Sequence, residues 1–213
     1  LGYTSAQAVA LAGAAVVARM LPGFVAGAVD DQGMDFYSAR AALLVEGAVV
    51  GWVLAGGKST AQDGTVHVNL FGSACLNVSH ANWAGVREFI AKAAGWITRV
   101  DLALDIFSGF DIKRVQEAYL SGAFDVRGKR PGQREHGSWT LGHSRTFEVG
   151  SRGTGKLFRG YEKGDEQFGP EANDPWVRLE CEIRSNHRIV DLDVLTRPAD
   201  FFAGAYAFCE TML

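Results

Sequence analysis

Apolar and polar residues alternate along several stretches of the chain, as they do in strands that bury one face. This alternation, or a short apolar run bounded by glycine, predicts strands at residues 35–44, 48–55, 65–71, 97–107, 145–150, 156–163 and 176–184. Most of these strands follow one another closely, as in hairpins, so the sheet is expected to be mainly antiparallel.

Helices are predicted between the groups of strands, from their caps, their composition and the glycine or proline that ends them. They lie after a Thr4 or Ser5 cap up to Pro22, at 83–94, from Asp111 to Gly122, and from Pro198 onward. Residues 125–142, rich in glycine and basic side chains, are predicted to be a loop. The fold class expected is α+β, a mainly antiparallel β-sheet with helices packed on one face.

The chain has 213 residues, of which 47% are apolar and 21% charged, as in an ordinary globular protein. This length suffices for one sizeable core or two small ones, and we predict a single domain over 1–213. Because the chain begins at Leu1 and stops within the last predicted helix, we expect it to be truncated at both ends. No apolar run approaches the length of about 18 residues that a membrane span needs. The three cysteines form no close pair, which favours reduced thiols and a cytoplasmic location.

A local excess of basic residues lies within a chain whose net charge is −3. Residues 127–163 hold nine basic and three acidic side chains, a net charge of +6. Such a segment can bind phosphate even when the whole chain is mildly acidic. The alternative is that it forms a solvated loop.

Three of the predicted strands each place ionisable side chains on one face. In chain order these are Asp101 and Asp105; Arg159, Tyr161 and Lys163; and Arg178, Glu180, Glu182 and Arg184. An antiparallel sheet with one solvent-exposed face and no metal site shows the same alternation. However, carboxylates gathered on one face repel each other unless a cation joins them. Hard divalent ions such as Mg²⁺ prefer such oxygen ligands.

Strand geometry limits which carboxylates could share an ion. Residues two apart on a strand are separated by about 6.6 Å and residues four apart by about 13 Å. Asp101 and Asp105 therefore cannot both ligate one ion. The predicted metal site is one of these aspartates with one or both of Glu180 and Glu182, and the sequence leaves the choice of aspartate open.

Tyr161 is the candidate nucleophile, because Arg159 and Lys163 share its face in the predicted strand. A phenol has a pKa near 10 and reacts poorly unless a cation or a base helps to remove its proton. A competing motif, the glycine-rich segment from Gly150 to Lys156, matches the spacing of a nucleotide-binding P-loop. It lacks the Ser or Thr that would bind Mg²⁺, since Leu157 stands there, and it precedes a predicted strand rather than a helix.

Four short blocks together resemble the replication initiation factor family, the rolling-circle Rep proteins of filamentous phages and of small plasmids of Gram-positive bacteria. They are Thr-Arg-Val-Asp-Leu-Ala-Leu-Asp at 98–105, Phe-Glu-Val-Gly-Ser-Arg at 147–152, Arg-Gly-Tyr-Glu-Lys-Gly at 159–164 and Trp-Val-Arg-Leu-Glu-Cys-Glu-Ile-Arg at 176–184. The resemblance covers roughly residues 65–213 and is closest to the phage branch. The His-hydrophobic-His pair common in the wider class of rolling-circle nucleases is absent, since His67-Val68-Asn69 has one histidine.

The resemblance implies an origin-specific nicking and rejoining endonuclease with catalytic residues on the sheet face opposite the helices. Tyr161 would form a 5′-phosphotyrosine, Arg159 and Lys163 would assist it, and the carboxylates would hold Mg²⁺ or Mn²⁺. The residues expected to bind DNA are Arg178, Arg184, Arg127, Lys129, Arg130, Arg134, Arg152 and Lys156. Expected partners are single-stranded or cruciform origin DNA, a host helicase and a second copy of the chain. The alternative is a non-catalytic DNA-binding replication regulator on the same scaffold.

Overall fold

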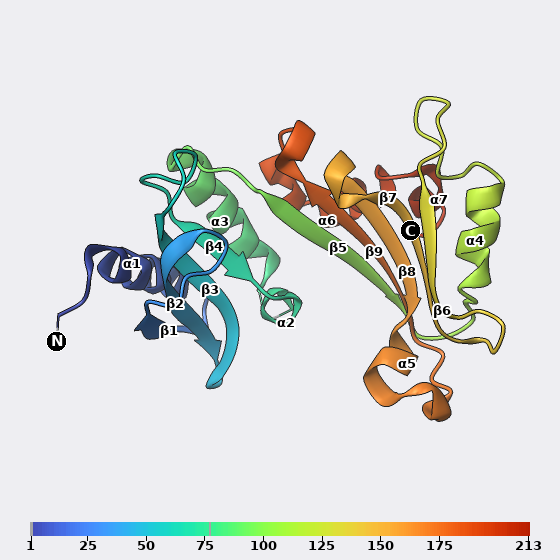
Figure 1. Cartoon of the computed structure of the whole chain (residues 1–213), viewed down its shortest axis with the longest axis horizontal. Helices are drawn as coiled ribbons and strands as arrows, with labels where there is room; N and C mark the ends of the chain where they lie inside the picture. Colours follow the sequence, from blue (N-terminus) through green and yellow to red (C-terminus); the bar gives the residue numbers. More distant parts are fainter. Residues whose placement is uncertain (1, 77) are drawn as a thin grey trace. The chain divides into compact units, whose positions relative to one another are not determined.

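The computed structural model describes residues 2–76 and 78–213 and divides into two compact units, Leu1–Glu88 and Phe89–Leu213. Each unit has its own antiparallel sheet and its own hydrophobic core (Figure 1). The domain expected over 1–213 thus contains two compact units. Among the described residues, no helix combines the length and apolar character that crossing a membrane requires.

The first unit is built from one long helix and a four-stranded sheet with the strand order β1-β2-β3-β4. Its elements are α1 (Ser5–Met20), β1 (Phe24–Asp30), β2 (Tyr37–Val45), β3 (Ala48–Gly57), β4 (His67–Leu70), the short α2 (Gly72–Cys75) and α3 (His80–Lys92), which continues past the end of the unit. Thr4 caps α1 through a reciprocal capping box with Gln7. Gly13 lets α1 approach the sheet closely, because a Cβ there would lie 2.9 Å from Val53 Cγ1.

The second unit contains a five-stranded antiparallel sheet with the strand order β5-β9-β8-β7-β6. Its strands are β5 (Arg99–Ile106), β6 (Gln133–Ser138), β7 (His143–Ser151), β8 (Lys156–Glu162) and β9 (Val177–Arg184). Its helices are α4 (Lys113–Leu120), α5 (Lys163–Phe168), α6 (Pro198–Ala203) and α7 (Ala207–Glu210). Single 3₁₀ turns lie at η1 (Arg152–Thr154), η2 (Pro170–Ala172), η3 (Ser185–His187) and η4 (Leu192–Leu195).

The apolar face of this sheet forms the core of the second unit together with α4, α6 and α7. Phe158 and Leu179 of the sheet are fully buried, as is Cys209 of α7. Gly160 allows the residues around α4 to pack tightly, because a Cβ there would lie 2.9 Å from Ile112 Cδ1 and 3.1 Å from Val115 Cγ2. These helices therefore cover one face of the sheet, and the expected α+β architecture is confirmed.

Several predicted boundaries were wrong. The predicted loop at 125–142 contains the edge strand β6, whose residues are mostly exposed and carry no apolar alternation. The predicted strand at 156–163 ends at Glu162, and the next residue begins α5. The last predicted helix is two short helices, α6 and α7, separated near Gly204. Strand β1 was not predicted, and β2 begins later than expected because the two residues before it have positive φ angles, 51° and 66°.

Candidate functional site

The strand registers bring the polar side chains of β5, β8 and β9 together on the sheet face opposite the core, which we call the polar face. Tyr161 of β8 lies opposite Arg178 of β9, which in turn lies opposite Asp105 of β5. In the next row, Arg159 lies opposite Glu180. The sequence correctly placed these five side chains on one face, and the registers now show which of them are neighbours.

Asp105 is held by a two-pronged ion pair at the Tyr161 end of the polar face. Arg178 donates Nε to Oδ1 at 2.7 Å and Nη2 to Oδ2 at 2.8 Å, and Trp176 donates its indole N–H to Oδ1 at 2.7 Å. Burial would raise the pKa of Asp105, but these hydrogen bonds outweigh it and hold the pKa below its usual range. Asp105 is therefore ionised, and its ion pair holds Arg178 beside Tyr161.

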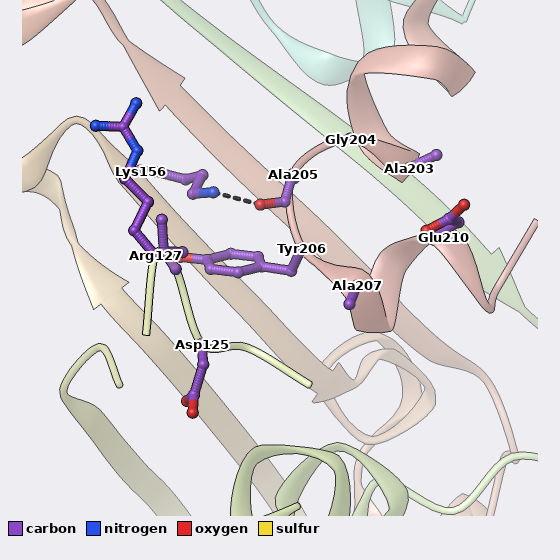
Figure 2. A pocket seen from close by; sticks show the side chains of 10 residues that line it. Asp125, Arg127, Lys156, Ala203, Gly204, Ala205, Tyr206, Ala207 and Glu210 are labelled. Atoms are coloured by element: carbon purple, nitrogen blue, oxygen red, sulfur yellow. Dashed lines mark hydrogen bonds between the residues drawn. The ribbon is translucent and has the colours of Figure 1, made fainter. Parts of the chain in front are cut away.

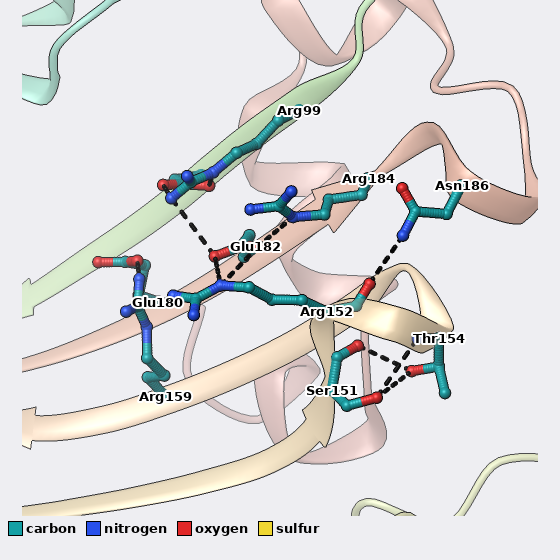
Figure 3. A network of polar contacts seen from close by, with 10 residues as sticks. Arg99, Ser151, Arg152, Thr154, Arg159, Glu180, Glu182, Arg184 and Asn186 are labelled. Atoms are coloured by element: carbon teal, nitrogen blue, oxygen red, sulfur yellow. Dashed lines mark hydrogen bonds and ion pairs between the residues drawn. The ribbon is translucent and has the colours of Figure 1, made fainter. Parts of the chain in front are cut away.

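Glu182 lies beneath three arginines at the other end of the polar face (Figure 3). Its side chain is 1% exposed and accepts from Arg184 Nε at 2.5 Å and Arg152 Nε at 3.1 Å, and it forms an ion pair with Arg99 Nη2 at 3.3 Å. Burial would raise the pKa of Glu182, but the hydrogen bonds from Arg184 and Arg152 outweigh it and lower the pKa. Arg99 also pairs with Asp101 at 2.5 Å. We call Arg99, Arg152 and Arg184 the arginine cluster.

Glu180 contacts both the candidate nucleophile and Arg159. Its Oε1 pairs with Arg159, and its Oε2 accepts a long hydrogen bond of 3.4 Å from the Tyr161 hydroxyl. Burial, together with the negative charge of Glu180, raises the pKa of Tyr161 to about 12, although Arg178 opposes the shift. The phenol is therefore protonated at neutral pH, and its proton must be removed for it to attack. Glu180 is the carboxylate placed to take its proton.

The carboxylates do not fit a divalent cation in this arrangement. Asp101, Asp105, Glu180 and Glu182 are each paired with at least one arginine. Over residues 2–76 and 78–213, no three His, Cys, Asp or Glu side chains converge in a way that could hold a metal ion. His67, the one histidine of the incomplete His-hydrophobic-His motif, lies in β4 of the first unit and stacks on Tyr37 at 6.0 Å between ring centroids.

One candidate lysine lies beside Tyr161, and the other lies on the opposite face of the sheet. Lys163 begins α5, where its Nζ pairs with Glu166 at 2.7 Å and lies 5.8 Å from the centroid of the Tyr161 ring. Lys156 points to the helix-covered side of the sheet, where its Nζ donates to the Ala205 carbonyl and lies 3.8 Å from the centroid of the Tyr206 ring (Figure 2). Together with Arg127 it lines a cavity of about 390 Å³ there.

The remaining basic candidates lie along β6 and the turn before it. Arg127, Lys129 and Arg130 are exposed, and Arg130 pairs with Asp125 at 3.1 Å. Arg134 lies opposite Glu148, which lies opposite Arg159, so its position belongs to the polar face.

Sequence reasoning missed the role of Arg99 in the arginine cluster. The alternation that placed Asp101 on the polar face also places Arg99 there, two residues earlier, and could have identified it. Trp176 was missed as well, because its bond to Asp105 joins residues far apart in the sequence.

The comparisons with known proteins agree with the fold. No curated protein matches the sequence. A solved structure, the rolling circle replication initiator protein from Geobacillus stearothermophilus, is similar to this chain with a TM-score of 0.59 at 20% identity. The similarity covers 89% of this chain and 74% of the other. The family model for replication initiation factors matches residues 95–213, which contain the whole five-stranded sheet, and the chain therefore belongs to the replication initiation factor family.

Proposed function

We propose that this chain initiates rolling-circle replication by nicking one DNA strand at an origin, with Tyr161 as the nucleophile. The observation that carries the proposal is the position of the Tyr161 hydroxyl, 3.4 Å from Glu180 Oε2 and in the same cross-strand row as Arg178. A phenol, a proton acceptor and a guanidinium group thus lie together on the sheet face that the core helices leave uncovered.

The reaction is a transesterification at phosphorus. The Tyr161 oxygen forms a bond to phosphorus, and the bond from phosphorus to the 3′ oxygen breaks. The 5′-phosphate remains on the tyrosine, and the 3′ oxygen leaves and takes a proton from water. Glu180 accepts the tyrosine proton, while Arg178 and Arg159 face the charge that develops on the phosphate oxygens. Because one ester replaces another, the reverse reaction rejoins the strand without ATP.

The test is the formation of a covalent adduct on labelled single-stranded and cruciform origin oligonucleotides. Tyr161→Phe keeps the ring and removes only the attacking oxygen, so the adduct should disappear while the fold is retained. The matched control is Tyr119→Phe, which removes a hydroxyl bonded to the Pro131 carbonyl at 2.8 Å and should leave the adduct unchanged. An adduct formed by the Tyr161 variant at the wild-type rate would refute the assignment.

The divalent cofactor implied by the resemblance is tested in the same assay. Adduct formation is measured in the presence of Mg²⁺, of Mn²⁺ and of EDTA, because the arginine-paired carboxylates do not accommodate an ion in the arrangement described above.

A non-catalytic DNA-binding regulator is the second candidate. It is favoured by the raised pKa of Tyr161, which leaves the phenol protonated at neutral pH, and by the pairing of the carboxylates with arginines. If the wild-type chain binds origin DNA yet forms no adduct with either metal, this second function replaces the first.

A further inference from the structure

A small apolar pocket lies beyond the end of the sheet where β5 begins and β9 ends. Its volume is about 210 Å³, and it is lined by Trp96, Ile97, Ser185, Arg188, Ile189 and Val190. An isolated antiparallel bridge between Ile97 and Val190 joins its two walls. All of its lining residues belong to the second unit.

Two large apolar side chains at this pocket are exposed to water. Trp96 is 59% exposed and Ile189 is 91% exposed. Apolar surface left in water forgoes the stabilisation that its burial would give the fold. Such side chains grouped around a hollow are typical of a binding site.

Hydrogen bonds tie this pocket to the arginine cluster. Ser185 N–H donates to the Thr98 carbonyl at 3.0 Å, directly beyond the position where Arg99 and Arg184 lie opposite each other. The turn that follows β9 is also bonded to the turn that carries Arg152. Its contacts are Asn186 Nδ2 to the Arg152 carbonyl at 2.9 Å, His187 Nε2 with the Gly153 carbonyl at 3.0 Å, and Arg188 Nη2 to the Thr154 carbonyl at 3.3 Å. Figure 3 shows the first of these bonds beside the cluster.

The charge next to the pocket favours an anionic ligand. The arginine cluster shares the carboxylates of Glu182 and Asp101. Three guanidinium groups share these two carboxylates, and Arg188 lines the pocket itself, so positive charge is in excess here. Arg152 and Arg99 are 54% and 43% exposed, so their remaining donors can reach a phosphate from solvent.

We propose that the pocket receives one unpaired base of a DNA strand, stacked on Trp96, while the neighbouring phosphate lies on the arginine cluster. A free phosphate would make no use of the apolar pocket, and a purely apolar ligand would make no use of the arginines. A nucleotide of a single strand offers both groups, whereas a base pair keeps its bases stacked in the duplex. This inference rests on the proposed function only in taking DNA as the ligand.

The test measures binding without nicking, by anisotropy of a labelled mixed-sequence single strand in EDTA with the Tyr161→Phe chain. Stacking on an aromatic side chain contributes about 1–3 kcal/mol per base, so Trp96→Ala should weaken binding roughly 5- to 150-fold. Trp96→Phe should restore most of the affinity. Leu120→Ala is the matched control, because Leu120 is 66% exposed but lies on α4, which packs on the opposite face of the sheet.

Two further comparisons separate a base contact from a structural effect. On fully paired DNA, Trp96→Ala should change the affinity less than twofold. A series of oligonucleotides, each with one base removed, is then compared. At one position, removal of the base should weaken binding by the chain that keeps Trp96 but should not weaken binding by the Trp96→Ala chain. Wild-type affinity of Trp96→Ala for the single strand, or equal losses on single and paired strands, would overturn the base pocket. An absence of covalent adduct would overturn nicking alone, since no step of this test requires it.

Discussion

Replacing Glu182 by glutamine removes the negative charge beneath the arginine cluster while keeping the shape of the side chain. Removing one partner of a buried ion pair costs about 3–5 kcal/mol. Because the three arginines are 30% to 54% exposed, water screens part of the lost attraction. We therefore expect the free energy of unfolding to fall by about 2 kcal/mol. DNA binding should become tighter, because the cluster gains one unit of positive charge.

The loss of stability has a defined pH dependence. The folded-state pKa of Glu182 lies below its ordinary value of 4.5, so the carboxylate stabilises the fold above that pH. Its contribution is lost as the pH falls through the lowered pKa. The gap in stability between the wild type and Glu182→Gln should therefore be full at pH 7 and shrink below about pH 4.5.

The assay combines urea unfolding at several pH values with anisotropy titrations of a labelled single strand from 50 to 300 mM salt. The slope of log K against log salt should steepen by about 0.7 for the added charge. Glu171→Gln is the matched control, since it removes one exposed negative charge from η2. An unfolding midpoint and a salt slope that both equal those of the control would refute the role of Glu182 as the anchor of the cluster.

Three further predictions follow from the same structure. Because Glu180 accepts the proton as Tyr161 attacks, the rate of adduct formation should change little from pH 7 to 9; a tenfold rise per pH unit would mean that the phenol, with its pKa of about 12, ionises before attack without a base. Gly160→Ala should destabilise the second unit by about 1–3 kcal/mol in urea unfolding, because the new Cβ meets the side chains packed around α4, and an unchanged midpoint would contradict that packing. Neutralising the exposed basic group of β6 and its preceding turn should flatten the salt slope on a single strand by up to about 3, whereas an unchanged slope would mean that the group is merely solvated. That group is Arg127, Lys129, Arg130 and Arg134.

The strands with a strict polar and apolar alternation could be predicted from the sequence. In β5 and β9 one face is buried, so every second residue is apolar and the period of two is visible. Strand β6 lies at the sheet edge and is mostly exposed, so no apolar period marks it. Strand β1 contains Gly27 and its register shifts between Ala26 and Val29, which interrupts the pattern.

The candidate site was predictable as a face but not as a set of partners. Alternation tells which side chains share a face, whereas the register between strands decides which of them meet. The sequence therefore placed Glu180 with the aspartates and could not show that Arg159 is its ion-pair partner. Lys156 was expected to bind DNA, although it lies two residues before the buried Phe158 and therefore on the same, core-facing side of β8. The sequence did contain this signal.

The opposing charges of β5 and β9 also bear on how the sheet assembles. In the observed alignment Asp105 lies opposite Arg178, whereas Asp101 lies opposite Glu182 and Arg99 opposite Arg184. A slip of one residue would turn the polar side chains into the core. A slip of two would keep the faces but place Asp105 opposite Trp176 or Glu180 instead of Arg178. Either slip of two loses the Asp105–Arg178 pair but places another opposite-charge pair together, Arg99 with Glu182 or Asp101 with Arg184. The apolar face therefore selects which side chains of β5 and β9 share a face, whereas the charges of the residues proposed to handle DNA do not by themselves select one alignment.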